Sequence, residues 1–329
     1  MSKAQIAGAL LSIGLVQAQS FGVFGGVSGP VQGFTFDPPA RHIRAVIGAL
    51  GSASLGPVLM SPVDTAFVAP GQNYAIAIRR GQVLFVSGLG SPQVSVAELA
   101  GSSVPDAVVW SDDASVAVLS SQAGGWIQIY AGFPGSINAG TPISTTALGG
   151  TLSAVAADAR GQRVAIGISG DQGGVFELAG GQSFSQVLGM AKPIALAYAA
   201  DDGVLYALDG STNQVSEISP TAQTWNLDAK DAVAIRPALD AANHKVLYVA
   251  GRSSRSLLVY DRSTHQLSSI VPLSFDPSII DPFGPNGFLL TRRSVGTDPL
   301  WSFTNSAQPA VYFVPAAPVS EARREVVQK

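Results

Sequence analysis

The segment that decides the fold begins Val63-Asp64-Thr65-Ala66-Phe67-Val68-Ala69-Pro70. Three more short apolar runs follow it, at residues 74–78, 83–86 and 94–96, each separated from the last by turn-forming residues. Short runs rich in β-branched and aromatic residues, bounded by Gly, Pro, Ser and Asn, are typical of strands joined by tight turns. We therefore expect this unit to be a four-stranded antiparallel sheet.

The same order of runs returns five more times along the chain. Besides that of the first unit, the predicted innermost strands cover residues 105–110, 152–157, 193–198, 231–236 and 276–281. Their spacing of about 37 to 47 residues indicates an internal repeat. Four short strands per repeat of about 42 residues are typical of a β-propeller blade, which packs both faces of its sheet against its neighbours. The sequence thus predicts an all-β propeller.

The N-terminal part of the chain supplies a further piece of a blade. Residues 36–46 align without a gap with residues 260–270, which are predicted to be a third strand, a turn and a fourth strand. On this alignment the chain enters the ring with the outer half of a blade, and strands from the C-terminal part must complete that blade and close the ring. Seven blades are favoured, and six remain as the alternative.

One stretch of the repeat resembles a known class of propellers. Residues 154–166, Ala-Val-Ala-Ala-Asp-Ala-Arg-Gly-Gln-Arg-Val-Ala-Ile, are similar to repeats of secreted bacterial β-propellers of the YVTN and NHL type, a WD40-like architecture. The hallmark YVTN tetrapeptide and the WD dipeptide are absent. The resemblance therefore implies the fold and transfers no catalytic residue.

Composition excludes several classes of protein. The chain has 329 residues, of which 12% are charged and 47% hydrophobic, and its net charge is −3. A slightly acidic chain offers little electrostatic attraction to nucleic acid, and such a hydrophobic chain is not expected to be disordered. The abundance of chain breakers, 36 Gly and 21 Pro, argues against long helices and leaves no uninterrupted run long enough for a membrane span.

The two ends of the chain carry the signals for location. Lys3, an apolar run over residues 4–16 and Ala18 are typical of a secretory signal peptide at residues 1–18, with a buried N-terminal helix as the alternative. We expect a single propeller domain over residues 19–314 and a solvated tail over residues 315–329. Because the chain has no cysteine, neither a lipid anchor nor a disulfide is expected. We predict a secreted or periplasmic protein that is a monomer.

Aspartates recur at the start of the predicted innermost strands. Four of the repeats place Asp64, Asp106, Asp231 and Asp276 at equivalent positions. In a propeller these positions surround one mouth of the axial channel, so the four carboxylates could form a partial ring that binds Ca²⁺ or a cationic ligand. The alternative is that each Asp caps a turn through hydrogen bonds to the backbone. No other cofactor is indicated.

The sequence favours binding over catalysis. It contains three scattered histidines, no cysteine, and none of the motifs of serine hydrolases, zinc proteases or phosphate-binding loops. The leading interpretation is a non-catalytic extracytoplasmic binding or scaffold module for a protein, peptide or surface polymer, and a subunit of an envelope assembly is a related option. The alternative is a metal-dependent hydrolase or lactonase with its ion at the axial mouth.

Overall fold

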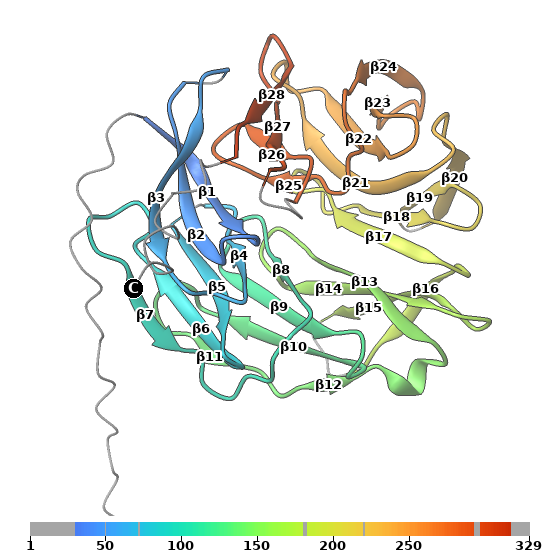
Figure 1. Ribbon diagram of the computed structural model, residues 1–329. Helices are drawn as coiled ribbons and strands as arrows, with labels where there is room; N and C mark the ends of the chain where they lie inside the picture. Colours follow the sequence, from blue (N-terminus) through green and yellow to red (C-terminus); the bar gives the residue numbers. More distant parts are fainter. Residues whose placement is uncertain are drawn as a thin grey trace, which may run out of the picture.

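Seven antiparallel sheets follow one another around a common axis in the computed structural model (Figure 1). The structure describes residues 30–49, 51–71, 73–179, 183–219, 221–292 and 297–316. The predicted signal peptide and nearly all of the predicted tail lie outside these residues. The prediction of an all-β, seven-bladed propeller is confirmed.

The strands are numbered in chain order and grouped by sheet. The first four sheets contain β1 (Val31–Asp37), β2 (His42–Ile47) and β3 (Ser54–Met60); β4 (Thr65–Val68), β5 (Tyr74–Arg79), β6 (Gln82–Ser87) and β7 (Ser95–Glu98); β8 (Ala107–Trp110), β9 (Val116–Ser121), β10 (Trp126–Ala131), β11 (Asn138–Ala139) and β12 (Ile143–Ser144); and β13 (Thr151–Ala157), β14 (Arg163–Ser169), β15 (Gly174–Ala179) and β16 (Ser185–Gly189). The last three contain β17 (Pro193–Tyr198), β18 (Leu205–Asp209), β19 (Gln214–Ile218) and β20 (Ala222–Asn226); β21 (Ala232–Leu239), β22 (Lys245–Gly251), β23 (Ser256–Asp261) and β24 (Leu267–Pro272); and β25 (Asp281–Pro282), β26 (Gly287–Leu289), β27 (Leu300–Thr304) and β28 (Ala310–Val314).

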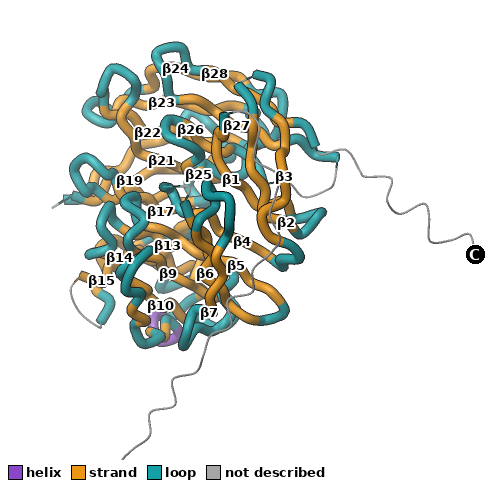
Figure 2. Tube along the Cα trace, turned by 90° about the vertical axis from the view of Figure 1, so that its left-hand side faces the viewer, coloured by secondary structure: helices purple, strands orange, loops and turns teal. Residues whose placement is uncertain are grey.

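Helix is nearly absent from the described residues. A single 3₁₀ turn at Thr146–Leu148 is the purple segment of Figure 2, and the other described residues are strand or loop. No helix in this part of the chain has the length and hydropathy of a membrane span.

Prolines account for two irregular blades. In the third sheet the outer strand is split, because β11 and β12 both pair with β10 and are separated by Gly140, Thr141 and Pro142. In the last sheet the inner strand was predicted over residues 276–281, but β25 covers only two residues. Pro277 and Pro282 have no N–H to donate, and the amides of Ser278 and Ile279 both donate to the carbonyl of Leu290.

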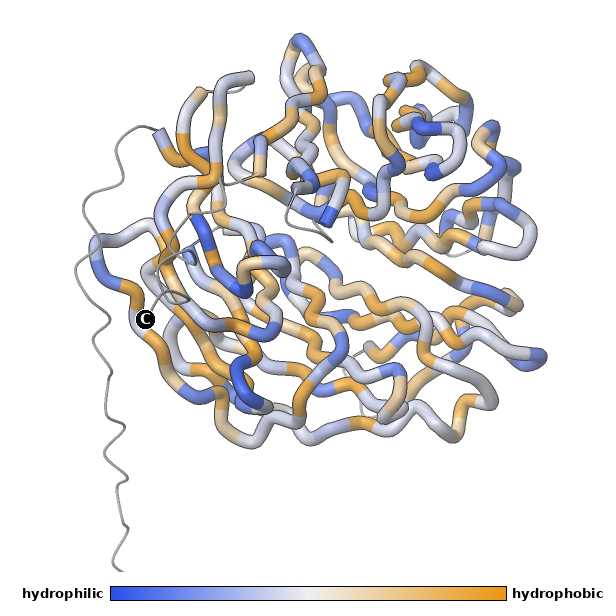
Figure 3. Tube along the Cα trace, in the orientation of Figure 1, coloured by the Kyte–Doolittle hydropathy of each residue, from blue (hydrophilic) through white to orange (hydrophobic). Residues whose placement is uncertain are grey.

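The core lies between neighbouring blades. The second strands of the third and fifth sheets, β9 and β18, are buried at every position, as expected for a strand whose two faces are both covered. One hydrophobic cluster, for example, joins Ala165 and Val175 of the fourth blade to Leu205 of the fifth. Hydrophobic segments follow the strands in Figure 3, and hydrophilic segments gather at the turns.

The predicted position of the N-terminal hairpin is wrong. β1 and β2 are the inner two strands of the first blade, since β1 contacts the innermost strand β4 and lines the axial channel. Both aligned hairpins contain a residue with positive φ at the same point of the turn, Arg41 with φ 58° and His265 with φ 58°. The alignment therefore detected a shared turn geometry and not a shared place in the blade.

The predicted closure of the ring by N-terminal outer strands is corrected as well. In the described residues the first sheet contains β1, β2 and β3 only, with no strand from the C-terminal part. The first and last blades lie side by side in Figures 1 and 2 and share a hydrophobic cluster of Val46, Ala53, Phe283, Leu300 and Val314. Side-chain packing thus closes the ring where strand exchange was expected.

We expect Leu300→Ala to destabilise the whole propeller. The side chain is 1% exposed at the junction of the first and last blades, and truncating a buried leucine costs about 2–5 kcal/mol. Thermal unfolding should remain one transition at a lower Tm, while Ile270→Ala on the outer strand β24, 55% exposed, should leave Tm nearly unchanged. A terminal blade that melts separately, with the other blades at the wild-type Tm, would contradict this role.

Candidate functional site in the axial channel

The innermost strands surround a channel that contains two cavities. The first axial cavity, of about 490 Å³, is lined by side chains that include Phe36, Phe67, Trp110, Arg236 and Arg292. The second axial cavity, of about 530 Å³, is lined mainly by β8, β13, β17 and β21. Both volumes lie in the range of pockets that hold small molecules.

Three aromatic residues line the first axial cavity. Phe36 comes from β1, Phe67 from β4 and Trp110 from β8, so three successive blades contribute. The Trp110 indole N–H donates to the Phe67 carbonyl at 3.3 Å. Its ring also packs edge-on against Tyr74 and Phe133 at centroid distances of 5.5 and 5.0 Å. These contacts hold Trp110 in one conformation.

Two arginines line both cavities together with Asp281. Arg236 of β21 forms an ion pair with Asp112, which follows β8 in the third blade on another side of the channel. Arg292 follows β26 and lies 3.2 Å from the carboxylate of Asp281. The Arg292 side chain is 63% exposed and the Asp281 side chain 48%. The Arg292 pair is therefore open to solvent and weakly held.

The four predicted aspartates occupy separate places. Asp64 lines the first axial cavity and Asp106 the second, while Asp231 and Asp276 line neither. In the described part of the chain, no group of three or more Asp, Glu or His residues could hold a metal ion. The structure therefore does not bring the four carboxylates together as one set of ligands.

Each of these carboxylates has partners in nearby turns. Asp106 accepts hydrogen bonds from the Ser121 hydroxyl and the Gln122 amide, both at 2.8 Å. Asp64 accepts from the Arg80 amide and pairs with Arg41, Asp231 accepts from the Ser253 amide, and Asp276 lies 2.7 Å from Arg255.

The carboxylate of Asp231 shows what such a cap does electrostatically. Burial would raise the pKa of this carboxyl, but hydrogen bonds from Ser253 and the Ser254 amide outweigh burial and lower it. Asp64, Asp106 and Asp231 cap the turn between the second and third strands of their own blade. This geometry fits the turn-capping interpretation, and a calcium site at these residues stays a prediction.

The residues with the strongest claim to a functional role were not selected from the sequence. Arg236, Arg292 and Asp112 are not among the site residues predicted from the sequence. A signal was present for Arg236, because it interrupts the apolar inner-strand segment Ala232-Val233-Ala234-Ile235. A charged side chain that follows four apolar residues in an innermost strand faces either a neighbouring blade or the axial channel.

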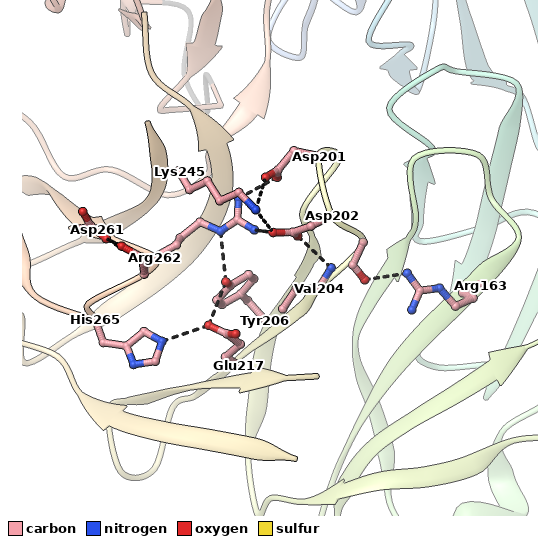
Figure 4. Close-up of polar contacts among 12 residues, drawn as sticks. Arg163, Asp201, Asp202, Val204, Tyr206, Glu217, Lys245, Asp261, Arg262 and His265 are labelled. Atoms are coloured by element: carbon pink, nitrogen blue, oxygen red, sulfur yellow. Dashed lines mark hydrogen bonds and ion pairs between the residues drawn. The ribbon is translucent and has the colours of Figure 1, made fainter. Parts of the chain in front are cut away.

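A second polar cluster joins the fifth and sixth blades (Figure 4). The Arg262 guanidinium, 2% exposed, donates to Asp201 at 2.7 Å, to both oxygens of Asp202 at 2.7 and 2.8 Å, and to the Tyr206 hydroxyl at 3.1 Å. Lys245 lies 2.8 Å from Asp202. Burial would lower the pKa of Arg262, but the hydrogen bonds to Tyr206 and Asp201 raise it.

The cluster continues outward through satisfied partners. The Tyr206 hydroxyl donates to Glu217 at 3.0 Å, and burial raises the pKa of Tyr206 to about 12 although Arg262 opposes this. His265 lies 3.0 Å from Glu217 and stacks on Trp225 with centroids 4.2 Å apart. The buried Trp225 indole N–H has no hydrogen-bond partner among the described residues, but each charged group of the cluster has one, so we assign the cluster to holding two blades together.

Comparisons with known proteins extend to the fold alone. No protein-family model matches the chain, and no curated protein matches its sequence. Among solved structures, a streptogramin B lyase is similar with a TM-score of 0.57 and 12% identity, over 79% of this chain and 86% of that one. AztD from Citrobacter koseri, in its apo form, is similar with a TM-score of 0.56 and 12% identity, over 86% of this chain and 95% of that one. Virginiamycin B lyase from Staphylococcus aureus is similar with a TM-score of 0.53 and 11% identity, over 91% of this chain and 99% of that one.

Turn capping makes a testable statement about Asp106. Replacing Asp106 by Ala removes the hydrogen bonds to Ser121 and Gln122, which should lower the free energy of unfolding by about 1 kcal/mol. The loss should be the same with calcium or with a chelator, as measured by thermal unfolding. If millimolar calcium raises the Tm of the wild type, and an Asp64→Asn/Asp106→Asn double variant loses that rise, the carboxylates bind an ion.

Proposed function

We propose that the protein is a non-catalytic, extracytoplasmic binding module that takes an apolar group of its ligand into the first axial cavity. The observation that carries this proposal is the aromatic lining of Phe36, Phe67 and Trp110 together with the charged groups of Arg236 and Arg292. Apolar walls with a few convergent polar groups are the usual composition of ligand pockets.

The rigidity of the channel supports a binding role. The cavity walls are strands of several blades, and strands hold side chains more firmly than loops do. Trp110 is fixed by a hydrogen bond and by two aromatic contacts. A preformed cavity loses little conformational entropy when it is filled, so a modest apolar contact suffices for measurable affinity.

The metal-dependent hydrolase ranks below the binding module. Such an enzyme needs an ion held by converging ligands, whereas Asp64 and Asp106 line different cavities and Asp64 pairs with Arg41. The lyase activity named for two of the similar structures is not carried over, because a shared fold at this identity does not define a reaction.

The extracytoplasmic location rests on residues 1–18. Their charged start, apolar run and small residues at the cleavage point support export with cleavage after Ala18. Mass analysis of the protein recovered from outside the cytoplasm should show a chain that begins at residue 19. An intact Met1 in that fraction would contradict the prediction.

The cavity is tested by filling it. Ala107 lies on β8 and lines the first axial cavity, so Ala107→Trp should occupy the space of a ligand. We expect wild-type protein to enhance the fluorescence of the neutral dye N-phenyl-1-naphthylamine, and the variant to bind it at least about tenfold more weakly. Ala241→Trp, at an exposed turn between β21 and β22, is the matched control. Equal dye binding by Ala107→Trp and wild type would refute the proposal.

A further inference from the structure

We propose that the first axial cavity binds a small carboxylic acid with an aromatic or apolar body, oriented by Arg292 together with Arg236. The inference rests on the proposed function and adds the chemical class of the ligand. It follows from the hydrogen-bonding capacity of the charged groups that reach the cavity.

The two arginines have unused donors. A guanidinium carries five N–H donors in a planar fork that matches a carboxylate. Arg292 makes one contact within the described residues, through Nη2 to Asp281 at 3.2 Å. Arg236 likewise contacts Asp112 through Nη2 alone. A ligand carboxylate can therefore join either arginine without displacing the aspartate already there.

The carboxylates that line the first axial cavity are less able to accept further hydrogen bonds from a ligand. Both oxygens of Asp64 are occupied, one by Arg41 and the other by the Arg80 amide. Asp281 is half-exposed beside Arg292. Asp112 lines only the second axial cavity, so the counter-ion of Arg236 lies outside the first. An anion meets the open donors of two guanidinium groups, whereas a ligand cation meets mainly the Asp281 carboxylate, whose charge Arg292 already neutralises.

The body of the ligand is inferred from the aromatic residues of the cavity. Phe36, Phe67 and Trp110 line the same cavity as the two arginines, and an aromatic ring placed against them would gain packing beyond simple burial. The combination selects an aromatic acid over both a neutral aromatic molecule and a short aliphatic acid.

The test uses three probes that differ only in their head group. 3-Phenylpropionate, 3-phenylpropanamide and 3-phenylpropylamine are titrated against the complex of the full chain with N-phenyl-1-naphthylamine, and dye displacement is measured. We expect the acid to displace the dye at about tenfold lower concentration than the amide or the amine. Raising the ionic strength from about 0.05 to about 0.5 M should weaken the acid and leave the amide unchanged.

Arg292→Gln should remove most of the preference for the acid, measured as the ratio of the acid and amide concentrations that displace the dye, so that any change in dye affinity cancels. Arg236→Gln is a second variant that should reduce the same preference. Arg255→Gln is the control, since Arg255 is another exposed arginine with an aspartate partner but lines neither cavity.

The outcomes separate the inference from the proposed function. Dye binding with equal displacement by acid and amide overturns the inference and leaves the binding module standing. An unchanged preference for the acid in both Arg292→Gln and Arg236→Gln also overturns it. If the wild type binds no dye and 3-phenylpropionate gives no heat in calorimetric titration, the proposed function itself falls.

Discussion

The structure depends on one constraint, which is that a blade cannot cover its own apolar faces. A four-stranded sheet whose central strands are apolar on both sides must be sandwiched between two other sheets. β9 and β18, buried at every position, meet that condition because a neighbouring blade lies against each face. Only a closed ring satisfies it for every blade, so the repeat and the circular architecture have the same cause.

In the described residues the first and last blades share no sheet and meet through side chains. The cluster of Val46, Ala53, Phe283, Leu300 and Val314 fills the junction of the first and last blades. Elsewhere, tyrosines of second strands add polar links to the next blade: Tyr74 donates to the Ala114 carbonyl at 2.7 Å and Tyr248 to Asn305 at 2.9 Å. Tyr206 joins the Arg262 cluster in the same manner. These hydrogen bonds connect neighbouring blades in a chain that has no cysteine and therefore no disulfides.

Sequence patterns predicted the repeated part of this fold and misplaced the part that is not repeated. β17 begins and ends where its apolar run does, at Pro193 and Tyr198, because alternation and flanking turns are local properties. The place of the hairpin formed by β1 and β2 is not local. A tight turn with a positive-φ residue at Arg41 or His265 looks alike in any hairpin, and only packing against β4 decides which hairpin is inner.

The candidate site was harder to predict for the same physical reason. Asp64, Asp106 and Asp231 recur at positions that cap the same turn of their blades, so recurrence drew attention to a feature that the blades share. Arg236 and Arg292 are not part of a pattern that recurs between blades. Their proximity to the axis depends on how the seven blades pack together.

A propeller leaves its axis free of the packing demand that shapes the blades, and this makes the polar side chains there informative. Arg236 could be replaced by an apolar residue without opening a gap between sheets, since its partner Asp112 belongs to a blade that is not its neighbour. Partly buried ion pairs contribute little to stability compared with well-packed apolar side chains. Neither blade packing nor turn geometry requires a guanidinium at this point. Recognition of an anion in the aromatic-lined cavity does require one, which is why the axis is where the function of this chain is to be sought.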